Sequence, residues 1–205
     1  MFKRVASDVL GISDIGSVIS PADYDKVDAD DYVMHEDNEK IYFLIKSKSD
    51  EYCFTNKAVI HLDGTSAMSK KRVLKRYSFR ENQISNVFLE TAGTVDMDVE
   101  IKFVIGTASF SIDVHKRFIE ELKDLYKALI KISEICAENE HSMEFAKKSI
   151  EVASATLGRA AGAREGNLTD DFRVLNETAF NWLMNSRKKY HVKDFGYVFE
   201  KFINN

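Results

Sequence analysis

Clustered cations are the first candidates for chemistry in this sequence. Five of them fall within seven residues, with no acid between them: Lys70, Lys71, Arg72, Lys75 and Arg76. Such a cluster could bind phosphate or another anionic group, as basic surfaces do on anionic lipids. The competing interpretation is a charged strand face that pairs with acids of the same chain or of a second copy. An acid-rich stretch between Asp23 and Glu39 offers such acids, and the sequence favours this second interpretation.

Alternating carboxylates form the second candidate. Asp96, Asp98 and Glu100 are separated by apolar residues, so a strand would place all three on one face. A hard cation prefers oxygen ligands, but its ligands usually come from loops that wrap around the ion. Carboxylates in steps of two along a strand do not converge in that way. We therefore expect hydrogen bonds to neighbouring strands rather than a metal site.

Other catalytic or metal-binding patterns are missing from the sequence. The five histidines are scattered, with no ligand spacing to one another or to Cys53 and Cys136. There is no phosphate-binding glycine loop and no dinucleotide fingerprint, and Gly11 to Gly16 is one residue too long for a nucleophile elbow. We expect no enzymatic activity, no catalytic residue, no metal and no cofactor.

Composition narrows the class of partner and the compartment. The formal net charge of −4 argues against nucleic acid. No run reaches the length of apolar residues that a membrane span requires, and Asp8 and Asp14 interrupt what would be a signal-peptide core. Two cysteines in unrelated local patterns are typical of reduced thiols. We expect a cytoplasmic protein.

The elements that position these residues are mostly strands. From Val95 to Phe103 apolar and charged residues alternate strictly, which is the pattern of a half-buried antiparallel strand. Similar runs separated by short turns predict strands over 40–48, 51–63, 68–79, 84–91, 95–105 and 109–114. Six or seven such strands indicate a barrel or a sandwich. Before them, the sequence predicts a helix over 2–19, ended by Pro21, and a solvated acidic loop over 23–39.

After residue 117 the period changes to that of a helix. Phe118, Leu122, Leu125 and Leu129 begin an apolar stripe that ends near Cys136, and a second stripe lies beside it. One stripe can cover the barrel and the other can meet another helix. The remaining sequence also predicts helices, with a Gly-rich interruption over 158–166 and a short final helix around Phe199. Their apolar seam, a predicted oligomerisation surface, comprises Met143, Ala146, Ile150, Ala153, Leu157, Phe172, Leu175 and Trp182.

The strand region resembles the bacterial pleckstrin-homology-like domains, once catalogued as a domain of unknown function. The resemblance rests on Asp50-Glu-Tyr-Cys-Phe-Thr-Asn-Lys57, Asp63-Gly64, Lys70-Lys71 and Glu90-Thr-Ala-Gly93 followed by Asp96, Asp98, Glu100 and Lys102. It covers about residues 1 to 135, and the helical tail resembles an extension regarded as an oligomerisation region. The resemblance implies an α+β fold, in which a bent seven-stranded antiparallel sheet or barrel is capped by a helix. It implies no enzymatic activity and no established ligand residues.

Together these observations predict two parts: a pleckstrin-homology-like domain over 1–137 and a helical extension over 138–205. The functional hypothesis is a non-enzymatic scaffold that self-associates through strand edges and the helical extension, because the barrel already has its cap and the tail presents further apolar seams. The alternative is a peripheral binder of anionic lipid or another anionic ligand through Lys70 to Arg76. The sequence identifies neither the physiological partner nor the number of subunits.

Overall fold

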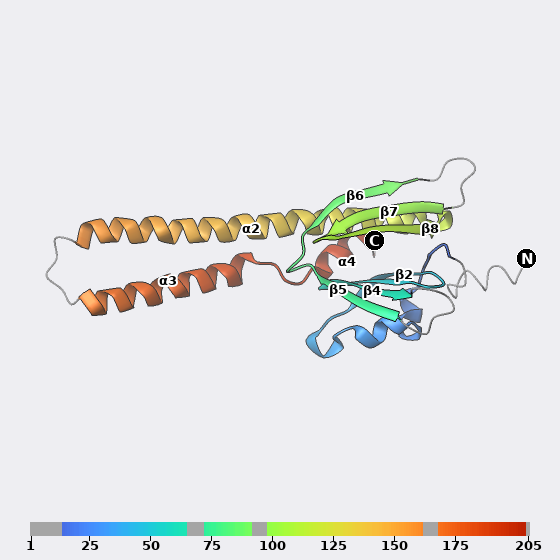
Figure 1. Ribbon diagram of the computed structural model, residues 1–205, viewed down its shortest axis with the longest axis horizontal. Helices are drawn as coiled ribbons and strands as arrows, with labels where there is room; N and C mark the ends of the chain where they lie inside the picture. Colours follow the sequence, from blue (N-terminus) through green and yellow to red (C-terminus); the bar gives the residue numbers. More distant parts are fainter. Residues whose placement is uncertain (1–13, 65–71, 92–97, 162–167, 204–205) are drawn as a thin grey trace, which may run out of the picture. The chain divides into compact units, whose positions relative to one another are not determined.

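The computed structural model describes residues 14–64, 72–91, 98–161 and 168–203 (Figure 1). The strands are β1 (Ser17–Val18), β2 (Ile41–Lys46), β3 (Glu51–Thr55), β4 (Ala58–Gly64), β5 (Arg72–Ser78), β6 (Ile84–Glu90), β7 (Asp98–Ile105) and β8 (Ala108–His115). Short 3-10 helices precede them as η1 (Pro21–Lys26), η2 (Asp28–Tyr32) and η3 (His35–Asp37), and η4 (Lys116–Phe118) follows β8. The α-helices are α2 (Ile119–Ala161), α3 (Leu168–Tyr190) and α4 (Gly196–Ile203).

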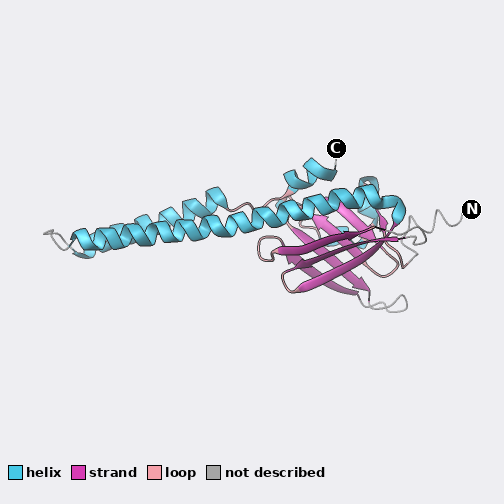
Figure 2. Ribbon diagram, turned by 90° about the horizontal axis from the view of Figure 1, so that it is seen from above, coloured by secondary structure: helices cyan, strands magenta, loops and turns pink. Residues whose placement is uncertain are grey.

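The strands form two antiparallel sheets. One has the order β1-β2-β3-β4-β5 and the other β6-β7-β8, and Figure 2 shows both beside α2. The sheets meet at Gly16, whose N–H donates to the Asp113 carbonyl at 2.8 Å while its own carbonyl accepts from His115. A side chain at position 16 would clash, since an added Cβ would lie 2.7 Å from Ile45 Cγ2. Glycine therefore permits the close approach that joins the sheets.

Both faces of the five-stranded sheet are buried. Successive side chains of β3 point alternately to the two faces, and apolar residues occur on both. Tyr52 and Phe54 face the three-stranded sheet, where Phe54 contacts Phe103 with ring centroids 5.9 Å apart. Cys53, on the opposite face, lies in a separate apolar cluster. The inter-sheet core continues into α2, whose buried residues there are Leu122, Leu125, Ala128, Leu129 and Ile132. The predicted apolar stripe of this helix is thus confirmed as a core-facing stripe.

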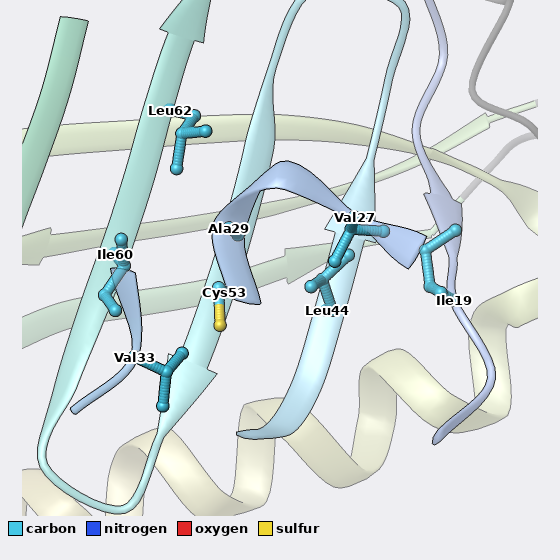
Figure 3. Packing of buried hydrophobic residues seen from close by; sticks show 8 residues of the cluster. All are labelled: Ile19, Val27, Ala29, Val33, Leu44, Cys53, Ile60 and Leu62. Carbon is cyan, nitrogen blue, oxygen red and sulfur yellow. The ribbon is translucent and has the colours of Figure 1, made fainter. Parts of the chain in front are cut away.

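The acid-rich segment corrects one prediction. Residues 23–39 are not a solvated loop but largely 3-10 helix, lying over the outer face of the five-stranded sheet (Figure 3). The apolar cluster beneath the segment contains Ile19, Val27, Ala29, Val33, Leu44, Cys53, Ile60 and Leu62. Sparse apolar residues among many acids are sufficient to bury the segment, because short 3-10 turns direct them inward while most of the acids stay at the surface.

Two further details differ from the sequence-based expectations. In the described part of the helix predicted over 2–19, Ser17–Val18 is instead strand β1, paired with β2. The strand predicted over 51–63 is two strands, β3 and β4, which turn at Asn56 and Lys57. The short turn predicted between the strands over 95–105 and 109–114 is confirmed. It contains Gly106, whose positive φ of 61° is a conformation that glycine adopts readily. The predicted α+β class is confirmed: the antiparallel strands form sheets of five and three strands, and the first part of α2 packs against them.

The chain divides into two compact units, 1–134 with 193–205 and 135–192. In the first unit, α4 packs against β2, and Phe195, Val198 and Phe199 are buried. The second unit is an antiparallel hairpin of α2 and α3 in which the Asn139 side chain bonds both the N–H and the carbonyl of Val192, at 3.0 Å each. The predicted division at residue 137 stays a prediction; the final helix, grouped there with the extension, belongs to the sheet unit by its contacts.

Candidate functional site

The described cations of the basic cluster are all engaged with acids. Arg72 pairs with Asp28, Lys75 with Asp63 at 2.7 Å, and the guanidinium of Arg76 with Glu39 at 2.8 and 3.0 Å. Two of these acids, Asp28 and Glu39, belong to the acid-rich segment over residues 23–39, which is called the covering segment below because it lies over the sheet. Lys70 and Lys71 lie outside the described residues. This geometry supports the interpretation of a strand face that binds acids of its own chain, whereas the anionic-ligand interpretation stays a prediction.

Glu39 is the centre of the buried part of this network. Its carboxylate accepts from Arg76, from the Thr55 hydroxyl and from the Met34 N–H at 2.9 Å. Burial by itself would raise the pKa of Glu39, but these hydrogen bonds and the charge of Arg76 outweigh it and hold the pKa below its usual value. A carboxylate with three donors is satisfied although it is buried. The network therefore fixes the segment before β2 to β3 and β5.

A second buried carboxylate holds the same segment at its other end. Glu51 on β3 accepts from the Ala29 N–H at 2.8 Å and from Lys46 Nζ at 2.5 Å. Both Glu51 and Glu39 are almost fully buried, whereas the acids of η1 and η2 are exposed or half-exposed. The two buried carboxylates, one on β3 and one in the acid-rich segment, therefore hold this segment against the sheet.

Two of the alternating carboxylates, Asp98 and Glu100, are described, and they lie on the outer face of the three-stranded sheet. Lys102 on β7 bridges Glu90 and Glu100, at 2.9 Å each, and Ser111 on β8 donates to Glu100. The Ser111 hydroxyl and then Lys102 hold the pKa of Glu100 below its usual value. Asp96 lies outside the described residues. Within the described ranges, no group of three or more His, Cys, Asp or Glu side chains could hold a metal ion.

An aromatic cluster between the sheets was not anticipated from the sequence. The imidazole of His61 stacks on Tyr52 with centroids 4.4 Å apart and contacts Phe110 edge-on. Its Nε2 lies 3.1 Å from Asp50 Oδ1, which satisfies the polar ring at the margin of the core. The cross-strand register Tyr52↔His61 creates this pair. Only the pairing of β3 with β4 brings the two rings together. The sequence predicted these two strands as a single strand over 51–63, so the contact could not be anticipated.

The predicted oligomerisation seam is split by the structure. Ala146 is buried and Met143, Ile150 and Leu175 are half-buried in the hairpin, whereas Ala153, Phe172 and Trp182 are exposed. The side chain of Leu157 is outside the description. Leu175 shares the inner face of α3 with Ala179, Leu183 and Ser186, at spacings of three and four residues. The inner residues close the hairpin, whereas Phe172 and Trp182 remain exposed. The role of the seam in oligomerisation stays a prediction.

Large apolar side chains outside that seam are exposed on both helices of the hairpin. On α2 they are Phe145 and Val152, seven residues apart and so on one stripe. On α3 they include Val174, Phe180 and Met184 in addition to Phe172 and Trp182. Phe145, Phe172 and Phe180 are 68%, 69% and 63% exposed. The sequence did not indicate most of these residues because α3 has apolar residues on more than one face, and the seam with the more regular spacing is the one inside the hairpin.

The cysteine thiols are not arranged for chemistry. Cys53 and Cys136 are both buried, and neither forms a disulfide. Burial raises the pKa of Cys136 to about 11, and it also raises the pKa of Cys53. A thiol with a raised pKa is largely protonated near neutral pH and is a poor nucleophile.

No helix in the described part of the chain is long and apolar enough to cross a membrane.

Comparisons with known proteins add to this geometry. Residues 9–133 match the bacterial PH domain family, and residues 144–205 match the YvbH-like oligomerisation region. The chain is 58% identical, over the full length of both chains, to the uncharacterized protein YvbH of Bacillus subtilis (strain 168). It is also similar to the crystal structure of a PH domain-containing bacterial protein from Exiguobacterium sibiricum 255-15. That similarity has a TM-score of 0.85 and 53% identity, and covers 93% of this chain and 100% of the other.

Proposed function

Because the chain belongs to the bacterial PH domain family and ends in a YvbH-like oligomerisation region, we propose that it is a non-enzymatic scaffold that self-associates through its helical hairpin and its strand edges. The single observation that carries this proposal is the exposure of large apolar side chains on the hairpin. Monomeric soluble proteins rarely expose such side chains in quantity unless they bind another molecule.

The exposure of these side chains indicates how much free energy their burial could contribute. Phe145, Phe172, Phe180 and Trp182 are each at least half exposed. Burial of one large apolar side chain contributes about 1.5–3 kcal/mol. Aromatic residues also dominate the binding energy of protein interfaces. Contacts among copies through these residues therefore contribute a substantial part of the free energy that must offset the entropy cost of association.

Strand edges are the second surface in the proposal. In the described sheets β5 pairs only with β4 and β6 only with β7, so each has an outer edge without a strand partner. Val73 and Leu74 on β5 are also largely exposed. An unpaired edge with apolar side chains is a template for pairing with another chain. The role of a scaffold agrees with the basic cluster, whose described cations bind acids of the same chain.

A charge-insertion experiment tests the hairpin surface. Replacing Phe180 and Trp182 with Glu in the full chain introduces a charge at two exposed apolar positions on different sides of α3, and we expect the molar mass measured by light scattering to fall. The matched control replaces Asn176 and Asn185, which are exposed polar residues of the same helix, with Glu. An unchanged mass in the Phe180→Glu, Trp182→Glu variant, with its fold intact by circular dichroism, contradicts the proposed interface.

A further inference from the structure

The last turns of α3 concentrate cations without acids among them. From Thr178 to Lys193 the sequence contains no Asp or Glu, although the whole chain has a net charge of −4. Arg187, Lys188 and Lys189 lie in the last turn and are exposed. The negative end of the helix dipole favours cations at this position. The dipole does not explain why exposed apolar residues accompany them.

Two of these cations share one side of α3 with large apolar residues. Phe180 and Met184 are four residues apart, and both are at least half exposed. Arg187 and Lys188 follow Met184 by three and four residues, so the four side chains are neighbours along one side of the helix. These four residues are called the basic face below. A face that is both positive and apolar is complementary to one that is both negative and apolar.

The basic face has no counter-charge within the described residues. The ion pairs of α3 there join Arg173 to Asp170 and to Glu177, and none includes Arg187 or Lys188. Glu177, which borders the face, is thus engaged with Arg173 at 3.8 Å. By contrast, the described cations of the cluster on β5 all pair with acids of their own chain. Another molecule can therefore neutralise the basic face without breaking an existing ion pair.

The covering segment presents the opposite combination. Between residues 23 and 37 its acids are accompanied by a single lysine. Its inward apolar residues lie on the sheet (Figure 3), whereas its outward apolar residues, Tyr32 and Met34, are about half exposed. Two exposed acids flank them, and the resulting acidic patch comprises Asp31, Tyr32, Met34 and Glu36.

The carboxylates of the acidic patch form no ion pair in the described part of the chain. The acids of the covering segment that form ion pairs there are Asp23, Asp28, Asp30 and Glu39. The cationic groups of the segment between residues 23 and 37 are used in two of these pairs, Lys26 with Asp23 and His35 with Asp30. Asp31 and Glu36 are therefore open to cations from another molecule.

We propose that the basic face of α3 in one copy binds the acidic patch of a second copy. This contact rests on the proposed self-association and joins two different surfaces of the chain. The cations of the basic face would neutralise Asp31 and Glu36, and its apolar residues would contact Tyr32 and Met34. Such a contact buries apolar side chains and pairs charges at the same time.

Charge and apolar surface together favour a second copy over an anionic membrane. A membrane would also accept cations and apolar side chains. However, it would have to approach a chain whose net charge is −4, and like charges repel. It would also leave the acidic patch without a partner. In the contact between copies, each surface supplies what the other lacks.

Charge reversal of each surface, alone and together, tests the contact in the full chain. One variant carries Arg187→Glu with Lys188→Glu, a second carries Asp31→Lys with Glu36→Lys, and a third carries all four changes. Light scattering over a dilution series measures the dissociation constant of the assembly. We expect each pair of changes alone to raise it at least about tenfold, because like charges then meet. The four changes together should restore it, because opposite charges meet again.

The matched control replaces Lys48 and Arg80, exposed cations outside both surfaces, with Glu. It makes the same change in net charge as the reversal of the basic face and should leave the dissociation constant unchanged. For the unmodified chain, added salt should weaken association, since it screens exposed charges. Circular dichroism checks that each variant is folded.

Three results would overturn the proposed contact. The first is association of the fourfold variant that is no tighter than that of the two single-surface variants. The second is an unchanged dissociation constant in either single-surface variant. The third is loss of co-sedimentation with phosphatidylglycerol vesicles by the basic-face variant at unchanged molar mass, which would assign the face to a membrane. In all three cases self-association itself stands when the unmodified chain has a mass above 23.4 kDa.

Discussion

The guanidinium of Arg76 on β5 donates to both carboxylate oxygens of Glu39, a residue that precedes β2 and is almost completely buried. Both hydrogen bonds come from one nitrogen, Nη2, and they join the acid-rich covering segment to the edge strand of the larger sheet. A sequence cluster that suggested a ligand-binding surface thus includes a residue with a structural role. Charge-assisted hydrogen bonds are among the stronger contacts in proteins.

The first prediction concerns this pair. Arg76→Ala leaves the buried Glu39 carboxylate with only the Thr55 and Met34 donors, and we expect it to lower the free energy of unfolding by about 2–3 kcal/mol. Arg72→Ala removes an exposed pair with Asp28 from the same strand and should cost about 1 kcal/mol or less. Urea unfolding of both variants measures the difference. Equal losses would contradict the structural role of Arg76.

The second prediction is the pH dependence of the same contact. Since the pKa of Glu39 is lower in the folded protein than its ordinary value of 4.5, the unfolded state takes up the proton first as the pH falls. The contribution of Glu39 is therefore present above about pH 4.5 and is lost as the pH falls through the folded pKa. Glu39→Gln removes this titration, so the free energy of unfolding of that variant should fall less steeply between about pH 5 and about pH 3. Parallel curves for the two proteins would contradict it.

The third prediction concerns the docking of α4. Phe199 is fully buried, with its ring 5.4 Å from that of Tyr42 and 6.4 Å from that of Phe79. We expect Phe199→Ala to cost about 3–5 kcal/mol, as for other buried phenylalanines. Phe202→Ala, a change of the same kind at a half-buried position of α4, should cost clearly less. The two values come from denaturant unfolding, and a smaller loss for Phe199 than for Phe202 would contradict the packing.

The fourth prediction concerns thiol reactivity. Burial raises the pKa of Cys136 from 9.0 to about 11, which reduces the thiolate fraction at pH 8 by about a hundredfold. Alkylation by iodoacetamide in the native protein should therefore be far slower than in urea. Mass spectrometry of peptides containing Cys136 and Cys53 measures both rates. Rapid native labelling of Cys136, without loss of fold, would show that the thiol is accessible and ionised.

The sequence predicted those elements whose pattern is local and regular. Strict alternation identified β7, and a stripe at helical spacing identified the part of α2 that contacts the core. The separation of β3 from β4 was missed because the turn contains neither Gly nor Pro. It is held instead by the Thr55 hydroxyl, which accepts from the N–H groups of Lys57 at 3.1 Å and Ala58 at 2.9 Å.

Tertiary contacts account for most of what the sequence did not predict. The covering segment has few apolar residues, and only the sheet beneath it shows that Val27, Ala29 and Val33 are buried. In the hairpin, the inner and outer faces of α3 both contain large apolar residues, so spacing alone could not distinguish Leu175 from Phe180. The pairing of Arg76 with Glu39, 37 residues away, likewise depends on the folded arrangement of the sheet.

Self-association is the central claim, and the molar mass of the unmodified full chain in solution tests it most directly. Light scattering coupled to size-exclusion chromatography should give a multiple of 23.4 kDa, and the mass should decrease only on dilution or when Phe180 and Trp182 are replaced with Glu. A mass of 23.4 kDa for the folded chain at every concentration up to about 1 mM, where even weak specific association is detectable, would contradict the account.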